Sequence, residues 1–144
     1  MKSVRQVLKA KGYAVESVNP ETTVYDALQK MSNRELGALV VLEDGNICGL
    51  VSERDYARKV VLQGKNSRET QVQEIMTRRV INVEPQQTVE ACMVLMTDKH
   101  IRHLPVVEEG RLIGIVSIGD IVKAVIEAQR LTIEELESYI TGRR

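Results

Sequence analysis

Two short stretches of the sequence place a hydroxyl and a carboxylate at the same spacing. Ser52 precedes Asp55 by three residues, and Ser117 precedes Asp120 in the same way, each after a glycine and two apolar residues. A serine with an acidic residue three positions on predicts a helix that begins with a capping box. A capped helix start attracts anions such as phosphate, and a carboxylate there can accept charge-assisted hydrogen bonds from a ribose diol. The pattern therefore predicts two helix starts that could also hold part of a nucleotide.

The cysteines and histidines offer weaker chemistry. Cys48 and Cys92 lie in apolar patterns with no neighbouring motif that would lower a thiol pKa, so we expect core residues. His100 and His103 are three residues apart, but no further histidine or paired cysteine completes a tetrahedral metal set. Nucleophile elbows, phosphate loops and dinucleotide fingerprints do not occur in the sequence. We predict no catalytic residue, no metal site and no catalytic cofactor.

The chain repeats itself, and each copy carries one of the two stretches. Residues 18–60 align without a gap on residues 83–125. Identical residues are spread along the alignment and include Pro20/Pro85, Thr23/Thr88, Met31/Met96, Gly45/Gly110 and Gly49/Gly114. A duplication of this kind predicts two units with the same fold.

Hydrophobic periodicity gives each copy the order β-α-β-β-α. A short strand, at 15–18 or 80–83, ends at a proline, which cannot continue a β-ladder. A threonine then caps a helix with apolar residues at helical spacing. Two apolar runs follow, joined by "EDG" or "EEG", in which the glycine supplies the positive φ of a hairpin turn. A second helix is expected at 53–62 and at 118–129.

The fold class is therefore α+β, with extra helices at both ends. We expect an N-terminal helix over "VRQVLKAKG" that stops at Gly12, a polar linker that ends in a short helical turn, and a separate last helix begun by Thr132 with Glu135 at capping-box spacing. Residues 1–70 would hold the N-terminal helix and the first repeat, and residues 71–144 the second repeat and the C-terminal helix. Each repeat is too small for a comfortable core, so we expect the two to pack about a pseudo-twofold axis as one module.

Composition excludes several classes of protein. The chain has 144 residues, 43% hydrophobic and 28% charged, as in globular proteins, and its apolar runs are too short for a membrane span. Lys plus Arg and Asp plus Glu number 20 each, so no net positive field favours nucleic acid. The N-terminus lacks the apolar core of a secretory signal. We expect a cytoplasmic protein that binds neither nucleic acid nor membrane.

The duplicated unit resembles a known family. Its repeated Gly-apolar-apolar-Ser-x-x-Asp, the "IMTRRVINVEPQQTV" opening and the "RHLPVVEEG" strand are similar to a tandem pair of cystathionine-β-synthase (CBS) domains, also called a Bateman module, over about residues 10–127. The stand-alone CBS-pair proteins of bacteria are most similar, with relatives in plant organelles. The resemblance implies a non-catalytic regulatory module that binds AMP, ADP, ATP, NAD or S-adenosylmethionine between its repeats, and a homodimer of CBS pairs.

The resemblance also implies a first nucleotide site. The ribose would bind Asp55. The phosphate would bind at Ser52 and Arg54, since a guanidinium suits phosphate oxygens. The adenine would lie among three residues of the second opening segment and four residues of the stretch around "IRHLP". These seven residues are Thr77, Val80, Ile81, Ile101, Arg102, His103 and Pro105.

A second site would differ in its charges. It consists of Tyr13, Val15, Glu16, Gly37, Ala38, Ser117 and Asp120. In this copy Gly37 and Ala38 stand in place of Arg102 and His103, and Gly119 stands in place of Arg54. The resemblance therefore implies adenosine recognition through Asp120 but weaker phosphate binding.

Three functions remain open at this point. The first is a sensor that responds to an adenylate by a change in conformation or assembly. The second is a structural or adaptor protein that docks a redox or metabolic partner without nucleotide control. The third is an enzyme that uses Cys92 or the histidine pair.

Overall fold

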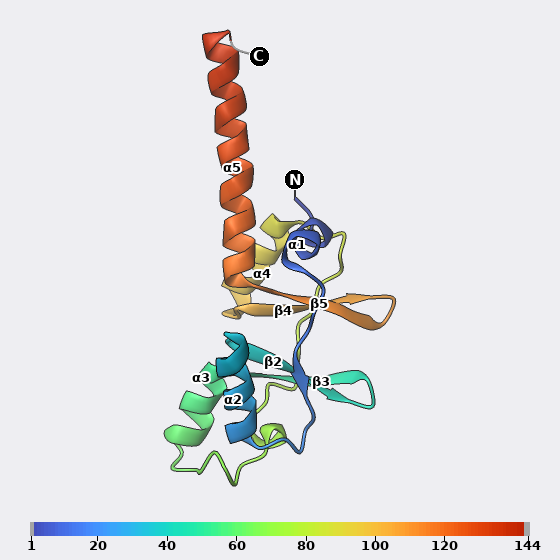
Figure 1. Ribbon diagram of the computed structural model, residues 1–144, viewed down its shortest axis with the longest axis vertical. Helices are drawn as coiled ribbons and strands as arrows, with labels where there is room; N and C mark the ends of the chain where they lie inside the picture. Colours follow the sequence, from blue (N-terminus) through green and yellow to red (C-terminus); the bar gives the residue numbers. More distant parts are fainter. Residues whose placement is uncertain (1, 143–144) are drawn as a thin grey trace. The chain divides into compact units, whose positions relative to one another are not determined.

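The computed structural model describes residues 2–142, which fold as two compact units of helices and short strands. Unit 2 comprises residues 14–81, and unit 1 combines the residues up to Tyr13 with those from Asn82 onward. The α+β class is confirmed. Each unit has one antiparallel hairpin and its own helices (Figure 1).

Unit 2 contains the first repeat and the linker. Its elements are β1 (Ser17–Val18), α2 (Val24–Arg34), β2 (Ala38–Glu43), β3 (Asn46–Ser52), α3 (Glu53–Tyr56), the π-helical turn η1 (Ala57–Val61) and the 3-10 turn η2 (Val72–Glu74). The strands are ordered β1-β2-β3, with β1 parallel to β2 and β3 antiparallel to it. Asp44 and Gly45 form the hairpin turn with φ of 51° and 80°, the positive values that match a turn to the twist of its strands.

Apolar side chains at helical spacing form the core of unit 2, as the sequence predicts. Val24, Ala27 and Met31 of α2 are buried against Leu39, Val41 and Val51 of the hairpin. The same cluster takes in Val60 of η1 and three linker residues: Val72, Ile75 and Met76. The linker therefore forms part of the core of the first repeat.

Unit 1 contains the second repeat and both ends of the described chain. Its elements are α1 (Val4–Lys11), α4 (Val89–Lys99), β4 (His103–Glu108), β5 (Arg111–Ser117) and α5 (Ile118–Thr141). In place of the strand expected at 80–83, Val83 makes a single parallel bridge to Val106. The buried α4 residues Val89, Cys92 and Met96 repeat the spacing of the buried α2 residues.

The segments that precede the two repeats dock in equivalent ways, each on the other repeat. The N–H of Val4 in α1 donates to the Gln87 carbonyl at 2.8 Å, and that of Val72 in η2 donates to the Thr22 carbonyl at 2.8 Å. Leu8 lies over Gly114 as Met76 lies over Gly49, so close that a Cβ on either glycine would clash. The N-terminal helix thus packs on the second repeat, although the sequence places it beside the first.

Two predicted boundaries were wrong. The C-terminal apolar segment is helical but not separate, because α5 runs unbroken from Ile118 to Thr141. The Thr132 hydroxyl donates to the Ala128 carbonyl one turn earlier at 3.0 Å instead of capping a new helix, an alternative open to threonine inside a helix. The helix expected over 53–62 is α helical only to Tyr56 and continues as η1. The N-terminal helix and its end at Gly12 are confirmed.

Candidate functional site

Ser52 begins α3 with the predicted capping box. Its hydroxyl oxygen accepts the N–H of Asp55 at 3.2 Å, while the N–H of Ser52 donates to the Asp55 carboxylate at 2.9 Å. Extended backbone at Ser52, with φ of −130°, turns the chain from β3 into the helix. The carboxylate is thereby fixed at the end of the strand, and its side chain is 14% exposed.

Ser117 begins α5 with the same geometry. The N–H of Asp120 donates to the Ser117 hydroxyl at 3.2 Å, and that of Ser117 donates to the Asp120 carboxylate at 2.8 Å. The Asp120 side chain is 24% exposed. Both predicted caps are confirmed as local structure.

The first amide of each helix is already hydrogen bonded within its unit. The N–H of Glu53 donates to the Gly37 carbonyl at 3.1 Å, and that of Ile118 donates to the Arg102 carbonyl at 2.8 Å. Since the third amide is held by the serine hydroxyl, two of the first three N–H groups are engaged before any ligand arrives. A phosphate at either start would therefore depend mainly on the helix dipole and on nearby cationic side chains.

These bonds bring the central-strand residues of each repeat next to the helix start of the same repeat. Ala38 pairs with Ser52 in unit 2, and His103 pairs with Ser117 in unit 1. In the predicted sites, however, Ser52 belongs with His103, and Ser117 with Ala38. Each predicted site combines residues of both units and stays a prediction.

A lysine neutralises each carboxylate. Lys59 contacts Asp55 at 3.2 Å and donates to the Ile75 carbonyl of the linker at 2.9 Å. Lys11 contacts Asp120 at 2.6 Å and donates to the Ile115 carbonyl of β5 at 2.8 Å. Each lysine therefore links a capped carboxylate to the docked segment of its unit.

Sequence reasoning missed both lysines. Lys59 lies one helical turn after Asp55, a spacing that predicts contact on a helix. No local spacing could have found Lys11, which lies far from Asp120 in the sequence and approaches it through the docking of α1.

The surroundings of Asp120 shift its pKa in opposing directions. Burial on its own raises the pKa, but the hydrogen bonds from Lys11 and from the Ser117 N–H, together with the charge of Lys11, outweigh it. The net result is a pKa below the ordinary value, so the group is ionised at neutral pH and keeps its lysine partner.

His103 has a lowered pKa. Burial is the main cause, and the positive charges of Lys11 and Arg102 add to it, while Asp120 acts in the opposite direction. The imidazole is therefore neutral at pH 7 and can donate or accept a hydrogen bond.

The other predicted site residues lie along strand edges and turns. Thr77 exchanges two backbone hydrogen bonds with Leu50, at 2.9 and 3.0 Å. Glu16 is ion-paired with Lys30 and Arg34. Tyr13 is 45% exposed. The carbonyl of Pro105 accepts the N–H of Val83 at 3.0 Å, and Val15, Val80, Ile81 and Ile101 are half-buried.

The cysteines match their expected place in the core. Cys92 is fully buried, and Cys48 is half-buried with its thiol 3.5 Å from the Val41 carbonyl. Burial raises the pKa of both thiols, which disfavours the reactive thiolate. Within residues 2–142, no group of three or more His, Cys, Asp or Glu side chains could hold a metal ion.

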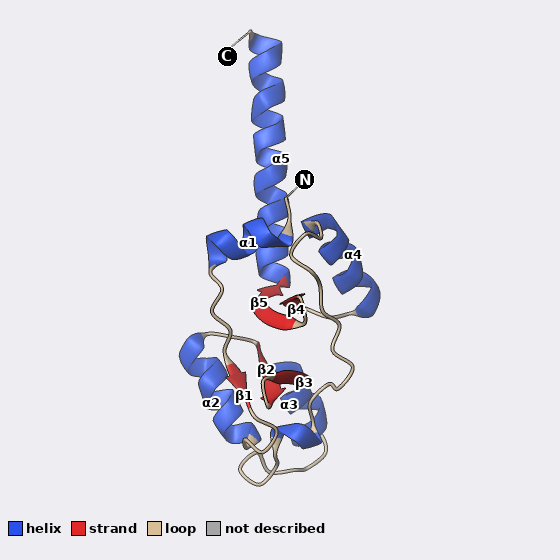
Figure 2. Cartoon of the chain, turned by 90° about the vertical axis from the view of Figure 1, so that its right-hand side faces the viewer, coloured by secondary structure: helices blue, strands red, loops and turns tan. Residues whose placement is uncertain are grey.

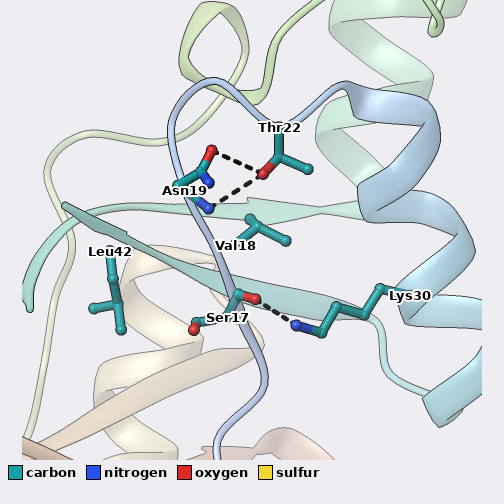
Figure 3. Close-up of a pocket in the computed structure, with 6 residues that line it drawn as sticks. All are labelled: Ser17, Val18, Asn19, Thr22, Lys30 and Leu42. Atoms are coloured by element: carbon teal, nitrogen blue, oxygen red, sulfur yellow. Dashed lines mark hydrogen bonds between the residues drawn. The ribbon is translucent and has the colours of Figure 1, made fainter.

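An open pocket of about 410 Å³ lies elsewhere on unit 2, beside β1 (Figure 3). Its polar groups bond to one another: Lys30 donates to the Ser17 carbonyl at 2.6 Å, and the Thr22 hydroxyl donates to Asn19 at 3.0 Å. The pocket is lined by Ser17, Val18, Asn19, Thr22, Lys30 and Leu42, and by none of the predicted site residues.

Two repeats that share a helix, an antiparallel hairpin and a second helix begun by the same capped carboxylate define a class of tandem modules. The family model described as "CBS domain" matches twice, at residues 5–62 and 72–127. The chain belongs to the CBS-domain family, and the resemblance predicted from its sequence is confirmed.

Similar proteins come from plants and bacteria. The mitochondrial CBS domain-containing protein CBSX3 of Arabidopsis thaliana is 40% identical, over 97% of this chain and 72% of its own. A solved structure from Burkholderia ambifaria, described as a candidate signal-transduction protein with CBS domains, is 50% identical with a TM-score of 0.86, over 89% of this chain and 96% of its own. The hexameric CBS-CP12 protein of bloom-forming cyanobacteria is 28% identical with a TM-score of 0.75, over 83% and 66%.

Among the described residues, no helix is both long enough and apolar enough to cross a lipid bilayer.

Proposed function

We propose that this protein is a non-catalytic regulatory module that binds adenosine-containing ligands, namely AMP, ADP, ATP or NAD. The observation that carries the proposal is the duplicated helix start, which fixes a carboxylate at the end of a strand in each unit. A ligand that binds one state of the module better than another shifts its conformation or assembly, and a regulated partner would read the change.

The contacts of Asp55 indicate how a ribose could bind. One carboxylate oxygen accepts from Ser52, and the other contacts Lys59, whose side chain is 46% exposed. A carboxylate has about four lone-pair positions. A ribose diol can therefore occupy the remaining positions or displace the exposed lysine, which would then be available to a phosphate.

The contacts of Asp120 favour weaker binding. Lys11 is 30% exposed and bonds to both the carboxylate and the Ile115 carbonyl. A ribose on Asp120 must compete with this more buried cation. We therefore propose that the site with Ser52, Arg54 and Asp55 binds more tightly than the site with Ser117 and Asp120.

Calorimetric titration with AMP, ATP and NAD tests the proposal. Asp55→Asn keeps the shape of the side chain but removes its charge, and we expect at least a tenfold loss of affinity for the tighter site, since hydrogen bonds to charged groups are worth about 1.5–3 kcal/mol. Asp120→Asn is the matched variant, and it should reduce only the weaker of two binding events in the titration. Absence of heat with all three ligands at millimolar concentration would contradict nucleotide binding and leave the adaptor function as the explanation.

Assembly is the second part of the proposal. We propose a homodimer of CBS pairs in the cytoplasm, because large apolar side chains are exposed on both units, among them Leu62, Val94 and Ile126. Some relatives assemble, as the hexameric cyanobacterial protein does. Sedimentation that gives a single 16.2 kDa species at every concentration would contradict the homodimer.

A further inference from the structure

The outer part of α5 is a helix without a covering surface in its own unit. Ile121 and Ala124 are its buried residues, and both belong to its first two turns. From Gln129 to Gly142 every residue is exposed except the half-buried Ser138. The helix extends well past α1 and α4, the other helices of unit 1 (Figure 2). An isolated helical segment of this length is marginally stable in water, so a partner is needed to stabilise it.

The apolar residues of this helix follow a heptad pattern. Alternating steps of four and three residues connect Val122, Ile126, Gln129, Ile133, Leu136 and Ile140, here called the α5 seam. Its larger members are well exposed: Ile133 by 55%, Leu136 by 57% and Ile140 by 80%. Apolar residues at such spacing, here with isoleucine at every second position, are typical of helices that pair by knobs-into-holes packing.

Three charged residues flank the seam, each one position after a seam residue: Lys123, Arg130 and Glu137. In an antiparallel pair with the register given below, Lys123 of each chain lies beside Glu137 of the partner subunit. A parallel pair keeps Lys123 two heptads away from the partner's Glu137, so these ion pairs cannot form. Opposite charges that flank a seam set the orientation of paired helices.

We propose that α5 pairs with α5 of a second copy of this chain as an antiparallel two-helix coiled coil along the α5 seam. Ile126 then packs against Leu136 of the partner subunit, and Ile140 packs against the partner's Val122. Near the centre, Ile133 meets Gln129 of the partner subunit. A polar residue at one seam position lowers stability and selects one register.

This inference rests on the homodimer proposed above, but not on nucleotide binding. It assigns the interface to one surface, so it can fail while the homodimer stands.

Sedimentation velocity over a series of concentrations tests the seam. We expect the double variant Ile133→Gln with Leu136→Gln to raise the dimer dissociation constant by on the order of tenfold or more, because two seam side chains lose their apolar packing. Glutamine is a good helix former, so the helix itself is little affected. Leu131→Gln is the matched control, since Leu131 is exposed by 59% but lies off the seam, and it should dimerise as the natural protein does.

Charge reversal tests the orientation. Glu137→Lys should weaken an antiparallel dimer, because the new lysine then lies beside Lys123 of the partner subunit. Adding Lys123→Glu should restore dimerisation. In a parallel pair Glu137→Lys would dimerise as the natural protein does, and that result would overturn the antiparallel arrangement.

The remaining outcomes separate this inference from the proposed function. An unchanged dimer in the seam variant would overturn pairing through α5 and leave the homodimer in place. A natural protein that stays monomeric would overturn both. Calorimetry with AMP on the seam variant gives an independent readout. If the variant dimerises more weakly but binds AMP with unchanged heat, the result supports the seam and shows that it is separate from the nucleotide site.

Discussion

The two units build the same capped carboxylate but neutralise it with lysines from different places. In unit 2 the cation is Lys59, one helical turn beyond Asp55. In unit 1 the position equivalent to Lys59 is Ala124, which is buried, and the cation comes instead from Lys11 of α1. The duplicated pattern therefore determines the position of the aspartate carboxylate in both units, whereas in unit 1 the docked helix α1 supplies the lysine that pairs with it.

This difference has a consequence for coupling within each unit. The pair of Lys59 with Asp55 is local to one helical segment and needs no docked segment to form. The pair of Lys11 with Asp120 exists only while α1 lies against β5 and α5. A change in α1 should therefore reach the carboxylate of unit 1 and leave that of unit 2 unaffected.

Removal of the buried anchor of α1 should have the largest effect. Leu8 is fully buried over Gly114, and Leu8→Ala should lower the free energy of unfolding by about 2–5 kcal/mol, the range for large-to-small core substitutions. Hydrogen exchange followed by mass spectrometry should show the loss of protection in β4, β5 and the start of α5.

The control for this prediction is Lys9→Ala on the exposed face of the same helix. It should change stability by no more than about 0.5 kcal/mol. Equal loss of protection in β2 and β3 after Leu8→Ala would show that α1 does not belong to unit 1 alone.

The Lys11 contact should make unit 1 sensitive to acid. Since the folded pKa of Asp120 is lowered, its contribution to stability is present above the unfolded value of about 3.9 and is lost as pH falls through the folded pKa. Lys11→Met should reduce this contribution by about 0.5–1 kcal/mol, because the pair is partly exposed and screened by solvent. Unfolding by urea from neutral to acid pH measures it.

The comparison for Lys11→Met is Lys9→Met, which keeps the Lys11 contact. The two variants should differ at neutral pH and converge in strong acid, where Asp120 is protonated. A constant difference at every pH would mean that Lys11 stabilises unit 1 through its Ile115 contact and not through Asp120.

The local parts of this architecture could be predicted from the sequence. The caps at Ser52 and Ser117 depend on residues three positions apart, and the hairpin turn depends on the adjacent residues Asp44 and Gly45. The core of α2 follows from a spacing of one helical turn. Such features are determined by neighbours in the chain, so pattern and propensity are enough.

The features that were missed depend on distant or competing contacts. Docking of α1 on the second repeat comes from Leu8 filling the space over Gly114, which no local pattern reveals. Thr132 fits the pattern of a cap, but its hydroxyl can equally bond the preceding turn inside a continuous helix. The two predicted nucleotide sites come from the family resemblance, because their residues are too far apart in the sequence for spacing to connect them.

The smallest predicted effect on stability comes from His103, which has no histidine counterpart in unit 2. His103 and Ala38 occupy equivalent positions opposite the cap serines. Burial lowers the pKa of His103 in the folded protein. As pH falls below about 6.5, the unfolded chain therefore takes up a proton before the folded chain does. The stability of unit 1 should decrease over this range, until the pH reaches the folded pKa. His103→Gln should remove this pH dependence, which urea unfolding between neutral and mildly acid pH measures.

The same imidazole can report on the nucleotide. Proton NMR should show the ring of His103 titrating below its ordinary value without ligand, and a pKa at or above that value would contradict the assigned effect of burial. In the proposed first site a phosphate would lie near this ring, and a negative charge raises the pKa of a histidine. Saturation with AMP should therefore move the titration upward in the natural protein and much less in Asp55→Asn. Equal shifts in both proteins would mean that the anion near His103 is bound independently of the Asp55 carboxylate.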